Sequence, residues 1–326
     1  MPTMTYREAI RLALREELNR DPNVMLMGED IAQFGGSFKV TLGLLDEFGP
    51  RRIMNTPLSE TAILGAAVGA AATGIVPVAE IMYGDFFAVA MDPVVNQAAK
   101  MRFMFGGKLV LPLTIRSTMG GRRSAAAQHS QCLEAWFMHI PGVLVALPSN
   151  PYDAKGLLKA AIREPNPVIV FENKMLYNSK GEVPEEDYIV PLGQARVVRP
   201  GRDVTIVALS DMVGFAEQAA ETLAAEGISA EIIDPRTIAP MDWTTIYDSV
   251  RKTGRLVVAH EANLTGGVGA EIAARAAHAC FDYLQAPIER VAAPDSPVPF
   301  APVLERAVLP DDGDVAAAVR RVMAYR

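Results

Sequence analysis

Residues 55–79 read N-T-P-L-S-E-T-A-I-L-G-A-A-V-G-A-A-A-T-G-I-V-P-V-A and contain a single charged residue, Glu60. The pattern predicts a helix over 61–73, a turn at the following glycine and a buried strand over 76–82. The uncharged run is about as long as the roughly 18 apolar residues that suggest a membrane span. Its glycines, its proline and its weakly hydrophobic alanines exclude that interpretation. We therefore expect a helix–turn–strand unit of a globular fold.

Glu60 stands at the predicted start of this helix, directly after Ser59. One interpretation is a surface acid in the first turn, which stabilises a helix by a few tenths of a kcal/mol or so. The other is a working carboxylate, because backbone N–H groups surround it and its neighbours offer no counter-ion. Local sequence leaves both open. Gly65 and Gly69 leave one helix face without side chains, which favours a close helix–helix contact within the chain or between subunits.

Length and composition limit the class of protein. A chain of 326 residues predicts about two domains. Its net charge of −7 and pI near 5.3 argue against nucleic-acid partners and anionic membrane surfaces. Cys132 and Cys280 form no C-x-x-C pair, so we expect no disulfide framework and a reducing compartment. The N-terminus resembles neither a signal nor a transit peptide, which favours a cytoplasmic location.

The chain alternates helical and strand patterns in two blocks. Thr5 and Glu8 form a capping-box pattern at the start of the first helix. In the first block we expect strands over 24–27, 76–82, 109–115, 143–147 and 168–171, with helices over 86–105 and 152–163. In the second block we expect strands over 204–209, 229–233, 256–259 and 288–291, with helices over 213–225, 269–280 and 314–323. This order predicts an α/β fold of two doubly wound domains with mostly parallel sheets.

A polar segment with Gly and Pro separates the two blocks. We predict a first domain over 1–185, a linker at about 175–200 and a second domain over 200–326. No internal repeat or low-complexity tract is present.

His129 is the histidine with the most suggestive surroundings. It lies in a small-residue loop after the predicted strand 109–115, and ligands of α/β domains bind at loops that follow the carboxyl ends of strands. Gln128, Ser130 and Gln131 are candidate hydrogen-bond partners for an acid–base imidazole. The alternative is a structural loop histidine. The other three histidines are His139, His260 and His278. We interpret His139 as a turn residue and His278 as structural. His260 follows the strand 256–259 and faces a loop, with a smaller chance of a functional role than of a structural one.

Neither glycine cluster predicts a nucleotide site. Residues 265–271 lack the G-x-G-x-x-G spacing, and residues 120–123 match no Walker A pattern. Phe86 and Phe87 follow the strand 76–82, where they either stack on an aromatic ligand or belong to the core.

Seven segments together resemble one family. They are P-L-S-E at 57–60, A-E-I-M-Y-G-D-F at 79–86, N-Q-A-A-K-M-R-F-M-F-G-G-K at 96–108, A-A-Q-H-S-Q at 126–131, P-S-N-P-Y-D-A-K-G-L-L at 148–158, D-P-R-T-I-A-P-M-D at 234–242 and G-V-G-A-E-I at 267–272. The chain resembles the β subunit of thiamine-diphosphate-dependent 2-oxo acid or acetoin dehydrogenases, the decarboxylating component of lipoyl multienzyme complexes. The resemblance implies an N-terminal pyrimidine-binding domain and a C-terminal transketolase-C-like domain.

The resemblance also implies residue roles. Glu60 corresponds to the carboxylate that hydrogen-bonds the pyrimidine ring and promotes loss of the thiazolium C2 proton, with Leu58 and Phe86 completing the cofactor contacts. His129 corresponds to an acid–base group at the reacting centre. Some members hold a monovalent cation such as K⁺ mainly through backbone oxygens at positions matching a set of five residues, from which Glu164-Pro165 departs. The set is Leu113, Ala161, Ile162, Glu164 and Asn166.

A missing motif points to a partner. No G-D-G followed about thirty residues later by Asn-Asn is present to hold Mg²⁺ and the diphosphate. The resemblance therefore implies an α subunit that supplies this half of the site in an α2β2 heterotetramer, together with a lipoyl-bearing dihydrolipoyl acyltransferase core. The loop around His129 is closer to pyruvate and acetoin enzymes than to branched-chain ones, and it does not separate pyruvate from acetoin.

Two alternatives remain. The first is the C-terminal half of a split transketolase-like enzyme, although S-E-T-A around Glu60 differs from the pattern usual in those enzymes. The second is a non-catalytic structural subunit, in which Glu60 and His129 would be dispensable.

Overall fold

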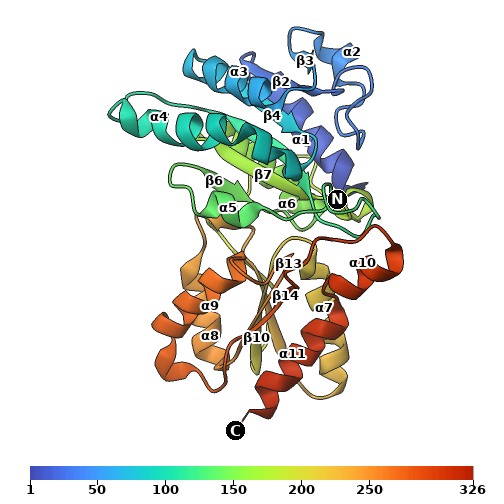
Figure 1. The fold of residues 1–326 in the computed structure, drawn as a ribbon, viewed down its shortest axis with the longest axis vertical. Coiled ribbons are helices and arrows are strands. Elements are labelled where there is room, and N and C mark those ends of the chain that lie inside the picture. Colours follow the sequence, from blue (N-terminus) through green and yellow to red (C-terminus); the bar gives the residue numbers. More distant parts are fainter. Residues whose placement is uncertain (326) are drawn as a thin grey trace. The chain divides into compact units, whose positions relative to one another are not determined.

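The computed structural model describes residues 1–325, which form two compact α/β units (Figure 1). The first unit contains residues 1–119 and 136–192. The second contains residues 120–135 together with the chain from 193 onward. The segment 120–135 is thus assigned to the second unit, and the linear domain boundary at about 175–200 stays a prediction.

The sheet of the first unit has the order β6-β7-β5-β4-β2-β3, and every neighbouring pair is parallel. Its strands are β2 (Val24–Glu29), β3 (Ile53–Thr56), β4 (Val76–Ile81), β5 (Thr114–Met119), β6 (Leu144–Ala146) and β7 (Val168–Asn173). A small antiparallel pair joins β1 (Thr3–Thr5) and β8 (Lys180–Glu182). The predicted parallel α/β fold is confirmed.

Helices cover both faces of this sheet. The predicted capping box of Thr5 and Glu8 is confirmed at the start of α1, which packs with α6 in one hydrophobic core. Helix α3 lies on the other face against β4. The helices of this unit are α1 (Tyr6–Arg20), α2 (Leu44–Phe48), α3 (Glu60–Ala72), α4 (Ala99–Met104), α6 (Pro151–Arg163) and the short turn η3 (Leu176–Asn178), with α5 (Glu134–Met138) where the chain re-enters it.

Two of the expected elements of the first unit are divided or shifted in the structure. The helix expected over 86–105 is three shorter pieces, a 3₁₀ turn η1 (Gly84–Ala90), a wide π turn η2 (Pro93–Ala98) and α4. Pro93 has no N–H to continue the hydrogen-bond ladder of the preceding turn. The strand expected over 109–115 is instead β5, which starts at Thr114, because Pro112 interrupts the apolar run before it.

The second unit has a sheet of order β14-β13-β10-β11-β9, parallel except for the pair β11–β9. Helices α7 and α11 pack together on one face, and α8 and α9 pack together on the other (Figure 1). The strands are β9 (Arg196–Arg199), β10 (Val204–Ala208), β11 (Ala230–Asp234), β12 (Thr237–Ala239), β13 (Leu256–Asn263) and β14 (Glu289–Ala293). The helices are α7 (Met212–Ala225), α8 (Trp243–Thr253), α9 (Val268–Ala279), η4 (Phe281–Tyr283), α10 (Pro302–Val308) and α11 (Asp312–Ala324).

No helix among residues 1–325 has the length and hydropathy needed to cross a membrane. The alanine-rich helix α3 ends at Ala72, well short of such a length.

Candidate functional site

Glu60 is the first residue of α3, one position earlier than the sequence pattern indicated. Ser59 occupies the N-cap position, but its side chain makes no capping hydrogen bond. The Glu60 side chain is only 8% exposed. Within residues 1–325 it has no hydrogen-bond or ion-pair partner among the side chains. A carboxylate at a helix N-terminus, buried and without a counter-ion, can form a hydrogen bond with a polar group from outside the chain.

Glu29 is a second carboxylate near Glu60 that sequence reasoning missed. It is the last residue of β2, at the carboxyl end of the sheet. Burial raises the pKa of Glu29, and the nearby charges of Asp30 and Glu60 raise it further. Its position directly after a predicted strand, in the pair Glu29-Asp30, was the available signal.

The turn η1 brings Phe86 to the start of α3. The Thr61 hydroxyl donates a hydrogen bond of 2.6 Å to the Val89 carbonyl, which ties the two segments together. Phe86 is half-buried, with its ring edge-on to Tyr83 at a centroid distance of 5.7 Å. Leu58 is 71% exposed. Leu58, Glu60 and Phe86 therefore lie on adjoining segments of the first unit.

Phe87, the other candidate for ring stacking, belongs to the core. It is fully buried and packs against Phe137 at 4.6 Å and Phe171 at 5.6 Å between ring centroids. Of the two expected roles for this aromatic pair, Phe87 takes the structural one.

A buried ion network holds the strands that lead into this region. Arg116 on β5 donates to Glu80 on β4 at 2.7 Å and to both carboxylate oxygens of Glu172 on β7 at 2.7 and 2.8 Å. Tyr177 donates a further hydrogen bond of 2.7 Å to Glu172. Burial lowers the pKa of Arg116, but the charges of Glu172 and Glu80 outweigh this effect and raise the pKa above its ordinary value. The network therefore keeps a charged arginine inside the sheet.

Hydroxyl groups on β5 fix the end of β4. Ser117 donates to the Ile81 carbonyl at 2.8 Å, and Thr118 donates to the Met82 carbonyl at 2.9 Å. These bonds fix the backbone shortly before the turn that carries Phe86.

His129 lies in the segment 120–135 of the second unit. Its side chain is half-buried, and its backbone N–H donates to the Ala126 carbonyl at 3.4 Å. Ser130, one of the expected orienting groups, is buried with its hydroxyl unpaired, so it does not hold the imidazole as predicted.

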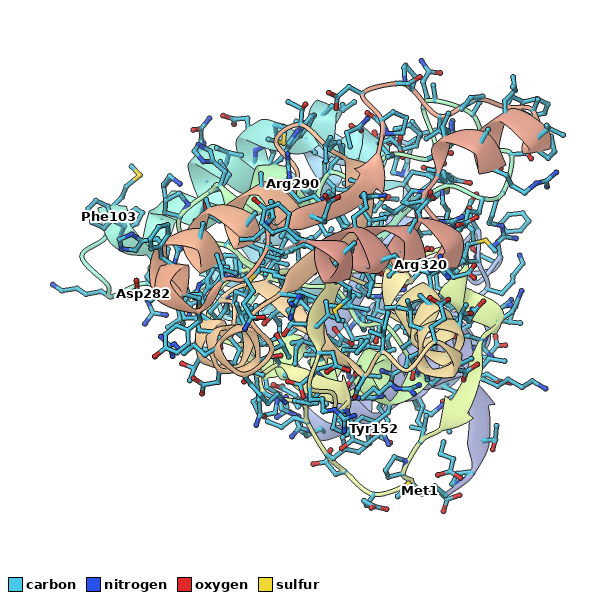
Figure 2. All side chains as sticks on the ribbon, turned by 90° about the horizontal axis from the view of Figure 1, so that it is seen from below. Met1, Phe103, Tyr152, Asp282, Arg290 and Arg320 are labelled. Carbon is cyan, nitrogen blue, oxygen red and sulfur yellow. The ribbon has the colours of Figure 1, made fainter. Side chains whose placement is uncertain are left out.

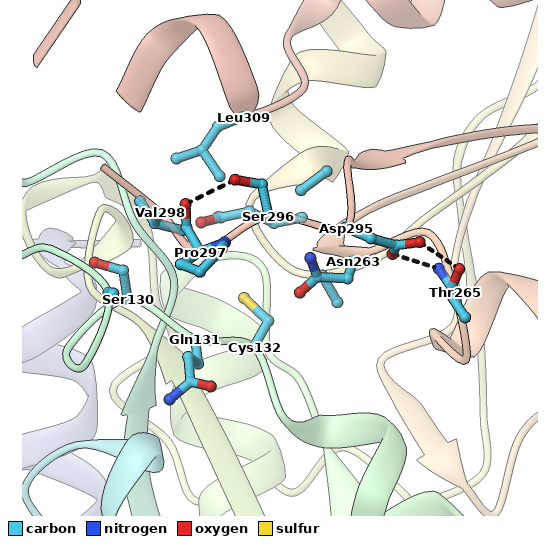
Figure 3. Close-up of a pocket in the computed structure, with 14 residues that line it drawn as sticks. Ser130, Gln131, Cys132, Asn263, Thr265, Asp295, Ser296, Pro297, Val298 and Leu309 are labelled. Atoms are coloured by element: carbon cyan, nitrogen blue, oxygen red, sulfur yellow. Dashed lines mark hydrogen bonds between the residues drawn. The ribbon is translucent and has the colours of Figure 1, made fainter. Parts of the chain in front are cut away.

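A pocket of about 570 Å³ lies beside this segment (Figure 3). Residues 127 and 130–132 form one side of the pocket, and the end of β13 and the loop after β14 form the other. Cys132 points its sulfur into the pocket, and Asp295 is held by hydrogen bonds from Thr265.

The second unit also buries several titratable groups. Burial raises the pKa of Glu134 to about 7, with a smaller contribution from the charge of Glu261. Burial also raises the pKa of Asp211 well above its ordinary value, and Glu261 adds to the effect.

His260 is not a strand-end residue facing a loop, as the sequence suggested. Strand β13 continues to Asn263, and the imidazole is fully buried against Gly267 and Gly269. Burial lowers the pKa of His260 to about 4. The histidine is therefore neutral at physiological pH and part of the core.

Of the five residues of the predicted cation site, Ala161 and Ile162 lie in the last turn of α6, Glu164 and Asn166 follow it, and Leu113 directly precedes β5. The Leu113 carbonyl already accepts the Val168 N–H at 2.9 Å. Arg102 donates to the side-chain oxygen of Asn166 at 2.5 Å. The Arg102 guanidinium therefore disfavours a monovalent cation beside Asn166, because like charges repel. Among residues 1–325 no group of three or more His, Cys, Asp or Glu side chains is arranged to hold a metal ion.

Comparison with known proteins gives consistent results along the whole chain. Residues 2–180 match the family model of the transketolase pyrimidine-binding domain, and residues 193–315 match that of the transketolase C-terminal domain. A solved structure described as a split gene transketolase, inactive beta4 tetramer, has a TM-score of 0.81 at 25% identity and covers 99% of both chains.

The sequence relatives are more similar. The pyruvate dehydrogenase E1 component subunit beta of Rhizobium meliloti is 48% identical over 99% of this chain and 70% of its own length. The acetoin:2,6-dichlorophenolindophenol oxidoreductase subunit beta of Bacillus subtilis is 46% identical, covering 98% and 97%. The 2-oxoisovalerate dehydrogenase subunit beta of Bacillus subtilis is 42% identical over the full length of both.

Proposed function

The chain belongs to the family of β subunits of pyruvate, acetoin and 2-oxoisovalerate dehydrogenases, and from this membership we propose that it is the β chain of a thiamine-diphosphate-dependent dehydrogenase component. Its substrate is a pyruvate-like 2-oxo acid or acetoin, and the acyl unit passes to a lipoyl group. The observation that carries the proposal is Glu60, a buried carboxylate at the start of α3 with no side-chain partner among residues 1–325.

Thiamine diphosphate supplies the electron sink for cleavage of a bond next to a carbonyl. Leu58, Glu60 and Phe86 fit its aromatic pyrimidine, because they combine an exposed apolar side chain, a hydrogen-bonding carboxylate and a half-buried ring. Glu60 would form a hydrogen bond to a pyrimidine nitrogen. His129 donates or accepts a proton at the substrate carbonyl or at the group that receives the acyl unit.

The diphosphate and its Mg²⁺ require residues that this chain lacks. Its sequence contains no suitably placed G-D-G motif. We therefore assign these contacts to an α subunit in an α2β2 assembly, which docks on a lipoyl-bearing acyltransferase core. A monovalent cation at Leu113, Ala161, Ile162, Glu164 and Asn166 is the part with the weakest support, because Arg102 already places a positive charge on Asn166.

The split-transketolase alternative is less well supported. The solved split transketolase is 25% identical to this chain, whereas the dehydrogenase subunits are 42–48% identical. A non-catalytic structural subunit would not need an unpaired buried carboxylate at Glu60.

The test of the proposal is Glu60→Gln in the assembled α and β chains. Loss of the carboxylate should abolish hydrogen–deuterium exchange at C2 of bound thiamine diphosphate without affecting assembly. Glu47→Gln is the matched control, because Glu47 is a half-exposed carboxylate of the same unit paired with Arg15. Exchange close to that of the wild type in Glu60→Gln would exclude the assignment.

The half-site is tested by calorimetry on the β chain alone. We expect negligible binding of thiamine diphosphate, and micromolar affinity without an α chain would contradict the division of the site. Reduction of 2,6-dichlorophenolindophenol with pyruvate, acetoin and 2-oxoisovalerate, compared side by side, identifies the substrate.

A further inference from the structure

The loop that precedes His129 has an unusual backbone. Alternate residues adopt positive φ: Gly120 at 89°, Arg122 at 65°, Ser124 at 52° and Ala126 at 61°. Three of these four are not glycine, so each pays a steric cost that persists only when the surroundings impose the conformation. Contacts within the second unit impose it here.

Two buried carboxylates receive the N–H groups of this loop. Glu261, at the end region of β13, accepts from the Gly121 N–H. Glu305, on α10, accepts from the Arg123 N–H at 3.2 Å and from the Ser124 N–H at 3.0 Å. Glu261 and Glu305 are only 6% and 3% exposed. Alternating backbone conformations direct successive N–H groups to one side and form a concave anion site, which here is occupied by side chains of the same unit.

Arg122 anchors the loop from the other side. Its guanidinium donates to the Pro310 carbonyl, lies 3.6 Å from the carboxylate of Asp211 and stacks over the ring of Phe215 at 4.4 Å. A Cβ at Gly121 would lie 2.6 Å from Cδ1 of Leu309, so any larger residue there requires that side chain to shift. The loop is therefore held by specific contacts at three successive positions, 121–123, and by the bond to Ser124.

After Ser124 the chain runs along a pocket. Residues 127 and 130–132 line the pocket of about 570 Å³ (Figure 3), so one side of the His129 segment is not packed against protein. The Ser130 hydroxyl is unpaired. On that side, close packing does not set the direction of the segment. The loop immediately before it is one of its supports, beside the hydrogen bond that the Gly120 N–H donates to the Gln131 carbonyl at 3.5 Å.

We infer that Glu305, assisted by Glu261, is a positioning residue for His129. The carboxylate of Glu305 holds the strained loop 120–126 and thereby sets where the imidazole lies. This inference rests on the proposed acid–base role of His129. It predicts that the charge of Glu305 is needed for the His129-dependent step and not for the proton exchange assigned to Glu60.

The variant is Glu305→Gln, which keeps the size of the side chain but turns an amide N–H₂ toward backbone donors. Hydrogen–deuterium exchange mass spectrometry on the full β chain should show faster exchange of the amides at 121–124, by about 10-fold or more, since bonds to a charged acceptor are the stronger kind. Peptides from β10 and α7 in the same run report on global unfolding. Glu226→Gln is the control, because Glu226 pairs at 2.6 Å with Arg320 on the exposed side of α11 (Figure 2).

In the assembled enzyme Glu305→Gln should lower kcat with pyruvate or acetoin by about 10- to 100-fold, as displacement of a catalytic group does. Exchange at the cofactor C2 and the KM should stay near the wild-type values, and Glu305→Asp should restore part of kcat. If His129→Asn lowers kcat while Glu305→Gln changes neither the loop amides nor kcat, the positioning role is wrong. If Glu305→Gln loosens the loop and His129→Asn leaves kcat unchanged, the proposed role of His129 is wrong instead.

If Glu305→Gln unfolds the second unit, Glu305→Asp becomes the test. That variant keeps the charge but withdraws it by one methylene. Loop amides that exchange as in the wild type, with kcat reduced, would overturn the inference.

Discussion

A strand network of the first unit and two buried groups of the second differ in how they hold charge. In the first, Arg116 donates hydrogen bonds to both Glu80 and Glu172, so one guanidinium is shared by two carboxylates. In the second, Glu134 and His260 are buried with side-chain atoms that have no hydrogen-bond partner among the described residues.

The two arrangements respond differently to mutation and to pH. A paired buried charge keeps its ionisation state near neutral pH and makes its unit sensitive to loss of the partner. An unpaired buried group becomes neutral instead, so its unit is sensitive to pH. We expect mutation to reveal the first kind of dependence and titration the second.

The largest expected effect is that of Arg116→Met in the first unit. The change leaves two buried carboxylates without their counter-charge and should lower the free energy of unfolding by about 3–5 kcal/mol. Urea unfolding in a Trp243→Phe background follows it through Trp136, the remaining tryptophan. The control Arg15→Met removes a half-exposed pair with Glu47 and should cost less than about 1 kcal/mol. Equal losses in the two variants would show that the buried network contributes no more than a surface pair.

The next effect is the pH dependence of Glu134. Burial raises its pKa in the folded protein to about 7 from 4.5. The stability it contributes is therefore fully present below pH 4.5 and lost as pH rises through 7, by about 3 kcal/mol in total. Glu134→Gln removes this loss. The free energy of unfolding of the variant, relative to that of the wild type, should therefore increase from pH 5 to pH 8.

Urea unfolding at both pH values in a Trp136→Phe background, followed through Trp243, measures the gain. His260 titrates in the opposite sense, since its lowered pKa weakens the unit below about pH 6.5. That contribution is common to both proteins and cancels. The exposed Glu271→Gln is the control, and a stability difference independent of pH would contradict the prediction for Glu134.

The smallest effect concerns the packing around His260. Gly269→Ala would place its Cβ 2.6 Å from Nε2 and 2.8 Å from Cδ2 of the buried ring. We expect this overpacking to lower the free energy of unfolding by about 1–3 kcal/mol. Gly214 lies in α7 of the same unit, and a Cβ there would have no atom within 4 Å. Gly214→Ala should therefore raise the free energy of unfolding by about 1 kcal/mol. Thermal unfolding that shifts both variants in the same direction would show that helix propensity outweighs the contact.

Elements with strong apolar patterns were predictable from sequence. The helix at Glu60 begins within one residue of its predicted start, and strands β4, β7 and β10 lie close to their expected ranges. Strand β5 was misplaced because its buried sequence, T-I-R-S-T-M, is mostly polar. The polar groups of Arg116, Ser117 and Thr118 are satisfied there by partners on β7, on β4 and just after β4, and a local pattern contains no information about those partners.

The candidate site shows the same limit. Leu58, Glu60, Phe86 and His129 were selected from sequence, and their roles stay predictions. The Arg116 network was missed because its partners are 36 and 56 residues away in the chain. The support of the His129 loop was missed because Glu261 and Glu305 lie 140 and 182 residues beyond the groups they bind.

The assignment of residues 120–135 to the second unit has a consequence for dissecting the chain. A fragment cut at the linear boundary, from residue 193 onward, would retain Glu261 and Glu305 but lose every backbone donor that they bind in 120–124. Two carboxylates buried in the intact protein would then lose these donors. A fragment that folds autonomously would need the segment 120–135 attached again. If two homologous proteins exchanged their chains at residue 193, the loop 120–126 and the carboxylates that bind it would come from different proteins.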